Sequence, residues 1–275
     1  MDTKWLVIGG GNMGAAVVRG AIAAGTWSAG AVVVVEPDAA KRSEFAGLGV
    51  RAAGSAAEAA AQVGAFHAVL LAVKPQMFAP VAADLRAAWH AAPAHPPLVA
   101  SIMAGITTAL ISRATGMPRV VRAMPNLPAT VGAGMAALAP GAGATEADVA
   151  VVERVFASVG RTIRVDESLI DAFTAVAGSG PAYVLSLCEA MAEAGVRLGL
   201  SSEDAALAAR QTVIGAGRLL EASALTPAEL RASVTSKGGT TAAALEVLNE
   251  AGANEVLARA IGAAARRAAE LARGG

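Results

Sequence analysis

Six residues near the start of the chain, Gly9-Gly10-Gly11-Asn12-Met13-Gly14, form a glycine-rich loop. They satisfy the spacing G-x-G-x-x-G with Gly9, Gly11 and Gly14, and they follow an apolar run that reads as a strand. In such loops the glycines permit a tight turn, close approach of the backbone to a pyrophosphate, and close packing of helix on strand. The helix that begins at Asn12 would direct free N–H groups and the positive end of its dipole at the phosphates. The loop therefore predicts a dinucleotide site, and the alternative is a tight turn without a ligand.

Residues at the end of the second predicted strand bear on which dinucleotide is bound. Glu36 lies twenty-five residues after Gly11, close to the spacing of about 20 at which an acid binds the 2′-hydroxyl of the adenosine ribose. That position favours NADH. Lys41 and Arg42 follow closely, and they could either pair with the 2′-phosphate of NADPH or lie on a solvated helix face. The sequence leaves the choice between NADH and NADPH open.

A second glycine loop, Gly238-Gly239-Thr240-Thr241, lies far along the chain and precedes a predicted helix. Successive glycines there expose backbone N–H groups, and the threonine hydroxyls add further donors, so that together they form a nest for an anion. The alternative is a glycine-rich helix start in which Thr240 caps the helix.

Side chains that commonly carry acid–base or metal chemistry are sparse. The three histidines, His67, His90 and His95, fall outside every motif, and we expect packing or solvent-facing roles for them. The single cysteine, Cys188, excludes an intramolecular disulfide framework and any multi-cysteine metal site. We expect no metal in this protein.

Charge and hydropathy exclude two classes of partner. The 275 residues contain 22 Lys and Arg against 22 Asp and Glu, without the basic excess typical of a nucleic-acid-binding protein. No apolar run approaches the ~20 residues that a membrane span requires. No basic stretch with a cleavage site precedes the first strand. We therefore expect a cytoplasmic protein that binds neither nucleic acid nor a membrane.

The elements that must position these loops change character near residue 166. Up to that point, short β-branched runs alternate with alanine-rich helical stretches, as in βαβ units on a mostly parallel sheet. The predicted strands are Lys4–Ile8, Ala31–Glu36, Ala68–Val73, Leu98–Ser101, Val120–Met124, Gly134–Ala139 and Arg161–Val165. The predicted helices are Asn12–Ala24, Ala39–Leu48, Ser55–Val63, Met77–Trp89, Thr107–Thr115 and Thr145–Ser158. The runs Val32–Val35 and Val69–Val73 are apolar at consecutive positions, which indicates burial on both faces.

After Val165 the strand pattern stops, and the sequence reads as helices only. These are predicted at Glu167–Val176, Pro181–Leu198, Glu203–Ala222, Pro227–Ser233, Thr240–Glu250 and Asn254–Leu271. A capping box at Thr226–Glu229 and a weaker one at Ser201–Asp204 support two of them. The predicted fold class is α/β, with a dinucleotide-binding Rossmann-type domain over residues 1–166 and an all-helical domain over residues 167–275.

Six short motifs occur along the chain in an order typical of one enzyme family. They are IGGGNMG (Ile8–Gly14), AVKPQ (Ala72–Gln76), SIMAGI (Ser101–Ile106), RAMPNLP (Arg122–Pro128), GSGPAY (Gly178–Tyr183) and VTSKGGTT (Val234–Thr241). Through them the chain resembles the pyrroline-5-carboxylate reductases along almost its whole length. The resemblance implies an N-terminal Rossmann domain and a C-terminal helical domain that forms a homodimer, often assembled into a ring of dimers. The implied reaction is hydride transfer from NADPH or NADH to the C=N bond of L-1-pyrroline-5-carboxylate, giving L-proline in the last step of proline biosynthesis.

The residue types fit an imine substrate. Reduction of a ketone makes an alkoxide, which requires a positioned proton donor, usually His or Lys. A protonated imine that accepts hydride becomes a neutral amine, so no anion must be neutralised. The motifs contain no histidine and no paired carboxylates. Catalysis would then arise mainly from proximity and orientation of the imine ring against the nicotinamide.

The resemblance also implies roles for residues of these motifs. Cofactor contacts are expected at Gly9, Gly11, Asn12, Met13, Gly14, Glu36, Ala72, Val73, Lys74, Pro75, Ala104, Met124 and Asn126. The substrate carboxylate is expected to bind at Gly238, Gly239, Thr240 and Thr241. Catalytic roles are expected for Lys74, Ser179 and Thr241, with Ser179 as a proton relay.

Some of these roles have plain structural alternatives. Lys74 could be a solvated lysine beside a turn shaped by Pro75, and Asn126 could hydrogen-bond locally and shape the turn Pro125–Pro128. Lys237 stands where the family usually has proline; it either adds charge near the carboxylate or points to water, and we favour the second. Two rival functions are a 3-hydroxyacid dehydrogenase-like oxidoreductase, which would need a catalytic lysine on a helix of the second domain, and a non-catalytic NAD(P)H-sensing dimer.

Overall fold

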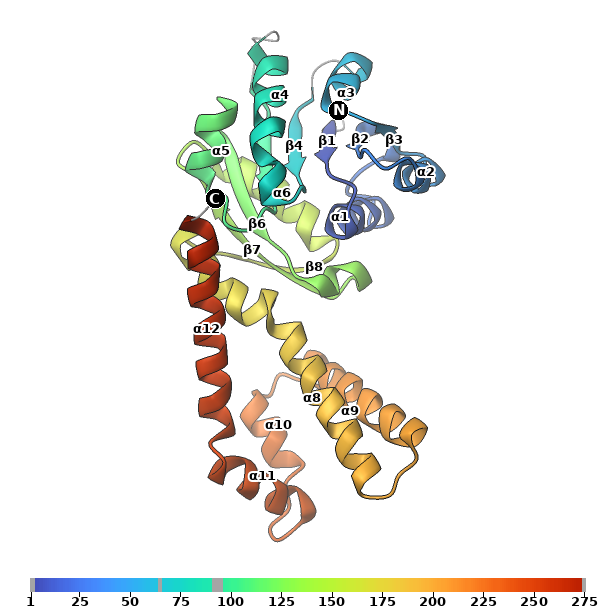
Figure 1. Ribbon diagram of the computed structural model, residues 1–275, viewed down its shortest axis with the longest axis vertical. Coiled ribbons are helices and arrows are strands. Elements are labelled where there is room, and N and C mark those ends of the chain that lie inside the picture. The colour runs from blue at the N-terminus through green and yellow to red at the C-terminus, as the bar shows by residue number, and fades with distance from the viewer. Residues whose placement is uncertain (1–2, 64–65, 91–95, 274–275) are drawn as a thin grey trace. The chain divides into compact units, whose positions relative to one another are not determined.

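A computed structural model describes residues 3–63, 66–90 and 96–273 and builds the first part of the chain on one eight-stranded sheet (Figure 1). The strand order is β3-β2-β1-β4-β5-β6-β7-β8, and its first six strands have the order of doubly wound dinucleotide-binding folds. All neighbouring strands are parallel except β6 and β7. The strands are β1 (Trp5–Ile8), β2 (Val32–Val35), β3 (Arg51–Ala53), β4 (Ala68–Leu71), β5 (Leu98–Ser101), β6 (Val120–Met124), β7 (Gly134–Pro140) and β8 (Gly160–Arg164).

Seven of these strands were predicted, and β3 was not. It has three residues, lies at the edge of the sheet against β2, and begins with the exposed Arg51. So short a run has no periodicity that would separate it from a loop. Strand β2 separates β3 from β1, the strand that leads into the glycine loop. Missing β3 therefore changes no prediction about the site.

Helices fill the connections between the strands, as predicted. They are α1 (Asn12–Ala23), α2 (Ala39–Gly47), α3 (Ala56–Val63), α4 (Phe78–His90), α5 (Thr108–Thr115) and α6 (Glu146–Ala157). Short 3₁₀ turns accompany them at η1 (Ala29–Ala31), η2 (Pro75–Met77), η3 (Leu127–Val131) and η4 (Glu167–Leu169). Parallel strands need such crossovers because their ends lie at opposite edges of the sheet.

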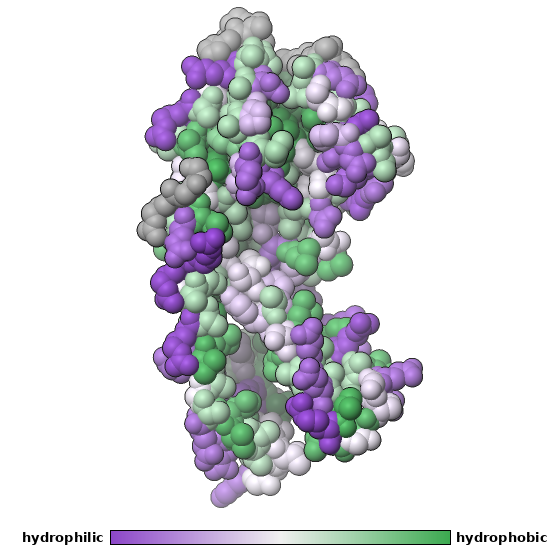
Figure 2. All heavy atoms as spheres, viewed as in Figure 1, coloured by the Kyte–Doolittle hydropathy of each residue, from purple (hydrophilic) through white to green (hydrophobic). Residues whose placement is uncertain are grey.

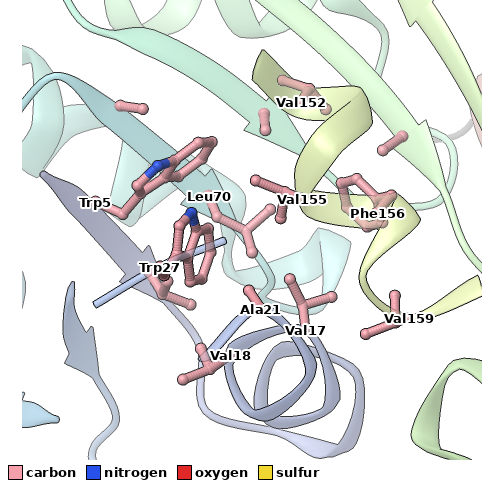
Figure 3. Close-up of a cluster of buried hydrophobic side chains, with 14 of the residues drawn as sticks. Trp5, Val17, Val18, Ala21, Trp27, Leu70, Val152, Val155, Phe156 and Val159 are labelled. Carbon is pink, nitrogen blue, oxygen red and sulfur yellow. The ribbon is translucent and has the colours of Figure 1, made fainter. Parts of the chain in front are cut away.

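The sheet buries both of its faces. Trp5 and Val7 of β1 belong to one apolar cluster, and the alternate residues Leu6 and Ile8 belong to another. In the first cluster, side chains of α1 and α6 meet Trp5, Trp27 and Leu70 (Figure 3). Burial on both faces confirms the reading of the consecutive valines Val32–Val35, all of which are buried.

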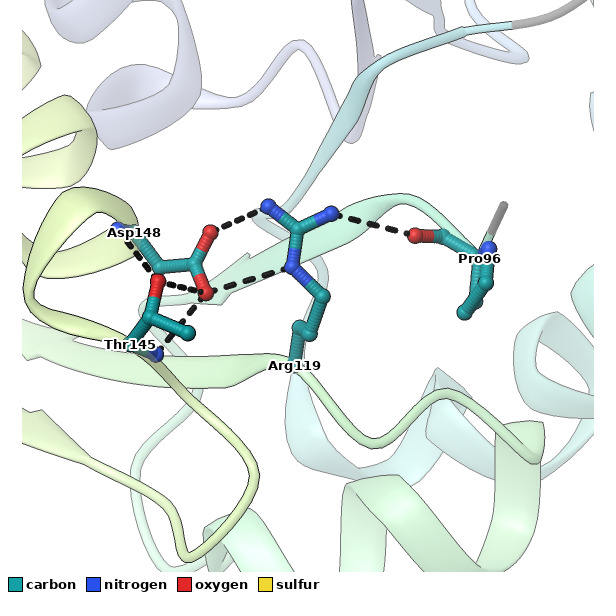
Figure 4. A network of polar contacts seen from close by, with 4 residues as sticks. All are labelled: Pro96, Arg119, Thr145 and Asp148. Carbon is teal, nitrogen blue, oxygen red and sulfur yellow. Dashed lines mark hydrogen bonds and ion pairs between the residues drawn. The ribbon is translucent and has the colours of Figure 1, made fainter.

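A polar network fixes the start of α6 to the strand beside it (Figure 4). Asp148 is 1% exposed and accepts hydrogen bonds from the backbone N–H and the hydroxyl of Thr145 at 2.9 and 2.8 Å. Arg119 donates to the same carboxylate from Nε at 3.2 Å and also from Nη2. Burial acts to raise the pKa of Asp148, but the hydrogen bonds from Arg119 and Thr145 outweigh it, so the pKa lies below its ordinary value.

Beyond β8 the described chain is helical. The elements are α7 (Ile170–Phe173), a π-helical turn η5 (Thr174–Gly178), α8 (Gly180–Arg197), α9 (Ser202–Ala222), α10 (Pro227–Ser233), α11 (Thr240–Glu250) and α12 (Ala253–Arg273). The predicted single helix Glu167–Val176 is wrong in form, because that stretch is divided into a 3₁₀ turn, a short α-helix and the π-turn. The capping predictions are confirmed: Thr226 and Glu229 form a reciprocal box, and Ser201 accepts from the N–H of Asp204.

Packing divides the chain into two compact units. The Rossmann unit comprises the described residues up to Gly178 and those from Ala264 onward, and the helical unit is Ser179–Ala263. In the described chain β8 is the last strand, so strands end where the composition changes near residue 166. The domain limits 1–166 and 167–275 stay a prediction.

Candidate active site

The glycine loop joins the carboxyl end of β1 to α1, and its three motif glycines have different surroundings. Gly9 has φ = 108°, and a Cβ there would overlap the carbonyl of Ala72. A Cβ on Gly14 would overlap the carbonyl of Gly9. A Cβ on Gly11 would have no neighbour within 4 Å. The first and third glycines are therefore required by packing, and the middle one leaves room where a ligand can approach the backbone.

The first turn of α1 is open to an anion. Gly11 is the N-cap, no side chain caps the helix, and its first turn contains no acidic residue. The N–H groups of the first turn have no partner within a helix of this kind, and the helix dipole adds positive potential there. These residues fit the pyrophosphate of a dinucleotide.

Glu36 follows β2 directly and faces the glycine loop. It is 8% exposed, and its carboxylate accepts hydrogen bonds from the backbone N–H of Gly10 at 2.9 Å and of Asp38 at 3.0 Å. Arg42 donates from Nη1 to the carbonyl of Glu36 at 2.9 Å, which holds its guanidinium at the same strand end, whereas Lys41 is exposed. Sequence reasoning missed the role of Gly10, because a backbone donor inside the motif carries no side-chain signal.

The predicted residues after β4 and β5 are partly brought together. Ala72 packs against Gly9, as described above, and Val73 contributes to the apolar cluster beneath the sheet edge. Pro75 and Ala104 line one groove of about 830 Å³ between α4 and α5. Lys74 begins the turn η2 and is exposed. Both readings of Lys74, as a residue of the site and as a solvated lysine, stay predictions.

Asn126, two residues beyond β6, is 9% exposed and uses both ends of its carboxamide. Its Nδ2 donates to the carbonyl of Ala177 at 2.9 Å, and its Oδ1 accepts from the N–H of Met135 at 2.9 Å. The reading in which this side chain shapes the turn Pro125–Pro128 is wrong, because both partners lie outside that turn. Contact of Asn126 or Met124 with the cofactor stays a prediction.

In the helical unit, the second glycine loop also ends in an open helix start. Gly238 has φ = 71°, and Gly239 is the N-cap of α11 with no side-chain cap. The reading in which Thr240 caps the helix is wrong, because Thr240 is the first residue inside it. Thr241 is half-buried and Lys237 is exposed. The N–H of Gly239 donates to the carbonyl of Ser236 at 3.1 Å, so an anion at this loop would bind mainly at the first N–H groups of α11, and the anion nest stays a prediction.

The predicted proton relay Ser179 and the histidines lie outside the two glycine loops, and the role of Ser179 stays a prediction. Ser179 is the half-buried N-cap of α8 and makes no capping hydrogen bond. His67 accepts the N–H of Lys4 on Nδ1 at 2.9 Å. His90 is the last residue of α4, and His95 lies outside the described residues. Over residues 3–63, 66–90 and 96–273, no three His, Cys, Asp or Glu side chains gather as a metal site. None of the helices described there is long and apolar enough to cross a bilayer.

Two parts of the chain match models of known protein families. Residues 167–271 match the family model for pyrroline-5-carboxylate reductase dimerisation, and residues 4–105 match the one for NADP oxidoreductase, coenzyme F420-dependent. Pyrroline-5-carboxylate reductase from Synechocystis sp. is 40% identical over 98% of this chain and 99% of its own length. The Pisum sativum pyrroline-5-carboxylate reductase is 34% identical over 96% and 94%.

Solved structures agree along the whole chain. A pyrroline-5-carboxylate reductase from Coxiella burnetii has a TM-score of 0.90 at 34% identity and covers 98% of this chain and 99% of its own. Plasmodium falciparum pyrroline carboxylate reductase, solved with NADP bound, has a TM-score of 0.81 at 25% identity and covers 98% of each chain. The identity and coverage show that this chain belongs to the pyrroline-5-carboxylate reductase family.

Proposed function

We propose that this protein reduces L-1-pyrroline-5-carboxylate to L-proline with NADH or NADPH as the hydride donor. The observation that carries the proposal is the glycine loop, whose middle glycine is open while the first turn of α1 is uncapped, in a chain that belongs to this family over its full length. Consumption of NADH or NADPH by the purified protein, followed at 340 nm with L-1-pyrroline-5-carboxylate present, tests the activity. Consumption with a 3-hydroxyacid substrate instead, or cofactor binding without turnover, would favour one of the two rival functions.

The reaction requires little acid–base chemistry from the chain. The reduced nicotinamide supplies a hydride, whose electron pair forms the new C–H bond while the C=N π pair moves to nitrogen. If the imine is protonated when it enters, the product is a neutral amine. The chain's residues then bind and orient the ring. Lys74, Ser179 and Thr241 are our candidates for contact with it.

The second glycine loop would hold the carboxylate of the substrate. Its support is the uncapped start of α11 and the positive φ of Gly238, which leave backbone N–H groups for an anion. We expect Thr241→Val to raise the KM for the substrate about tenfold, since a hydrogen bond to a charged group contributes about 1.5–3 kcal/mol, and to leave the Kd of NADH unchanged. Thr212→Val is the matched control, because the Thr212 hydroxyl bonds only within its own helix, to Ala208.

Glu36 would favour NADH over NADPH. Its carboxylate is fixed by two backbone N–H groups at the strand end where the adenosine ribose binds in such folds. A 2′-phosphate there would meet a buried negative charge, and repulsion of this kind discriminates between ligands. The Arg42 guanidinium donates to the backbone carbonyls of Glu36 and Pro37, and Lys41 is exposed.

The ratio of kcat/KM for NADH to that for NADPH tests this assignment. We expect Glu36→Gln to lower the ratio about 10- to 100-fold, which corresponds to about 1.4–2.8 kcal/mol of lost repulsion. The matched control is Glu44→Gln, whose exposed carboxylate pairs with Arg19 and should leave the ratio unchanged. A ratio that rises in Arg42→Gln and stays unchanged in Glu36→Gln would reverse the assignment, because Arg42 would then bind the 2′-phosphate of NADPH.

The helical unit would assemble two copies of the chain into a homodimer. The matched dimerisation region, residues 167–271, covers that unit, and its helices α8 and α9 border an apolar groove of about 840 Å³. The molar mass in solution, from light scattering after gel filtration, distinguishes a dimer from a ring of dimers. A cytoplasmic location is a further expectation, which cell fractionation tests.

A further inference from the structure

Three alternate residues, Arg122 and Met124 of β6 and Asn126 just beyond it, contact one stretch of chain, residues 167–178. Arg122 is 3% exposed, and its Nη1 lies 3.5 Å from Oε1 of Glu167, at the start of that stretch. Met124 packs in a small cluster with Ile170 and Phe173, in the middle of the stretch. Asn126 bonds Ala177 near its end. The RAMPN sequence thus contacts the stretch at three successive points, all within the Rossmann unit.

The contact at Ala177 satisfies a carbonyl that the helix cannot. In an α-helix that carbonyl would accept from the N–H four residues on, but this residue is Pro181, which has no N–H. The next residue, Ala182, donates to the carbonyl of Ser179 instead, at 3.0 Å. Ala177 is half-buried, and a carbonyl that is shielded from water and lacks a donor is costly. The Asn126 amide supplies the missing donor from outside the helix.

The opposite end of the same carboxamide is anchored in the sheet. Oδ1 of Asn126 accepts from the N–H of Met135, the second residue of β7. One side chain thereby joins the β7 backbone to the π-turn η5. The two partners fix the orientation of the amide, since its acceptor faces an N–H and its donor faces a carbonyl. Aspartate has the same shape but cannot donate when it is ionised.

We propose that Asn126 is a positioning residue for the reaction and not a cofactor ligand. By holding the Ala177 carbonyl it fixes the π-turn Thr174–Gly178, and the chain continues from that turn directly into Ser179-Gly180-Pro181. The resemblance places this loop in the substrate pocket, so the inference rests on the proposed function. π-Helical turns are frequent at functional sites, where they set the course of the chain.

The test compares three properties of Asn126→Asp with those of the intact protein. This substitution keeps an acceptor for Met135 and sets a carboxylate oxygen against the Ala177 carbonyl. We expect the KM for L-1-pyrroline-5-carboxylate to rise at least tenfold, the Kd of NADH to stay within twofold, and amide hydrogen exchange in residues 167–180 to quicken. The control is Thr130→Val, which removes the hydroxyl donor to Leu127 in the neighbouring turn and should leave all three unchanged.

Two results would overturn the inference. A tenfold weaker Kd for NADH with an unchanged substrate KM would make Asn126 a cofactor ligand. A lower melting temperature and a smaller active fraction, with KM and hydrogen exchange unchanged, would make its role purely structural. If Asn126→Asp does not fold, Asn126→Ala serves for the same comparison. Failure of the unsubstituted protein to reduce the imine would refute the proposed function. Hydrogen exchange is measured without the substrate, so it would still test whether Asn126 fixes the π-turn.

Discussion

The Rossmann unit and the helical unit differ in how much apolar surface each one buries. Strands of the Rossmann unit lie between two apolar clusters, and the side chains of Trp5, Leu70 and Phe156 are almost fully buried. In the helical unit, among the residues that the structure describes, only Ala205, Ala209 and Leu230 are buried hydrophobics. Its larger apolar side chains, such as Leu185 and Leu207, are more than half exposed.

The Rossmann unit covers its apolar residues within one chain, whereas the helical unit leaves many of its apolar residues uncovered. A sheet covered by helices on both faces buries its apolar residues within one copy. The pairing of α8 and α9 leaves apolar side chains on the surface of the helical unit, some of which are visible in Figure 2. Exposed apolar patches of this kind mark interaction sites. The comparison predicts that changes in the helical unit act through assembly, while changes in the Rossmann unit act on the fold of each chain.

The largest effect should come from a charge placed in the groove of the helical unit. Leu207 is 63% exposed in one chain and lines the groove between α8 and α9. In a symmetric dimer each substitution counts twice, and each loses about 2 kcal/mol of apolar burial, so Leu207→Glu should weaken the dimer about 1,000-fold. Sedimentation should show monomers that still bind NADH but no longer reduce the imine. The control is Leu48→Glu on α2's end in the Rossmann unit, and a dimer that survives Leu207→Glu would contradict the comparison.

A smaller but still large effect should follow from a cavity in the Rossmann core. Leu70 is fully buried on β4, and Leu70→Ala should lower the free energy of unfolding by about 3–4 kcal/mol. Leu230→Ala is the paired change in the helical unit, where the leucine is 9% exposed, and it should cost clearly less. Urea unfolding at one protein concentration measures both. Equal costs would mean that the two units are equally well packed.

The network around Asp148 should make the Rossmann unit sensitive to acid. The pKa of Asp148 is lowered in the folded protein, so its stabilising effect is present above the unfolded pKa of about 3.9 and is lost as pH falls through the lower folded value. At pH 7 we expect Asp148→Asn to cost about 2 kcal/mol, since the charge-assisted bonds from Arg119 and Thr145 are weakened. The difference in urea midpoint between the two proteins should shrink as pH falls from 7 toward 3. A difference that does not change with pH would assign the loss to packing alone.

The smallest effects should come from two capping boxes of the same design, one in each unit. Thr145 caps α6 beside the buried Asp148, and Thr226 caps α10 beside the exposed Glu229. Thr145→Ala should cost about 1–2 kcal/mol, and Thr226→Ala should cost less because water can replace the lost contacts there. Thermal unfolding of both variants checks the order. The reverse order would show that the local environment of a cap does not set its strength.

Much of the Rossmann unit could be predicted because its signals are local. Runs such as Val32–Val35 mark buried parallel strands. The glycine spacing marks a turn in which two close backbone contacts, at Gly9 and Gly14, exclude a side chain. Strand β3 was missed because three residues carry no periodicity. The π-turn could not be predicted either, since the carbonyl of Ala177 within it is bonded by the side chain of Asn126, which is fifty-one residues away in the sequence.

The candidate site could be predicted less fully than the fold. Motif residues identified the loops, but not which of their atoms are already engaged in the folded protein. The Asn126 amide is committed to Met135 and Ala177, and the Glu36 carboxylate to two backbone N–H groups. Such partners lie between nine and fifty-one residues away or on the backbone, where a sequence pattern carries no signal. The predicted roles of the motif residues came from the family resemblance, and their hydrogen-bond partners came from the structure.

The end of the last helix also affects the stability of the helical unit. A Cβ on Gly105 would lie 3.1 Å from the carbonyl of Leu271. The end of α12 therefore packs closely on the Rossmann unit, to which it belongs. The helical unit is therefore an insertion, and both of its ends are held while the Rossmann unit stays folded. When it unfolds alone it forms a closed loop, which has less conformational freedom than a free chain of the same length. The unfolded form of the helical unit is thus disfavoured by the fold of its neighbour.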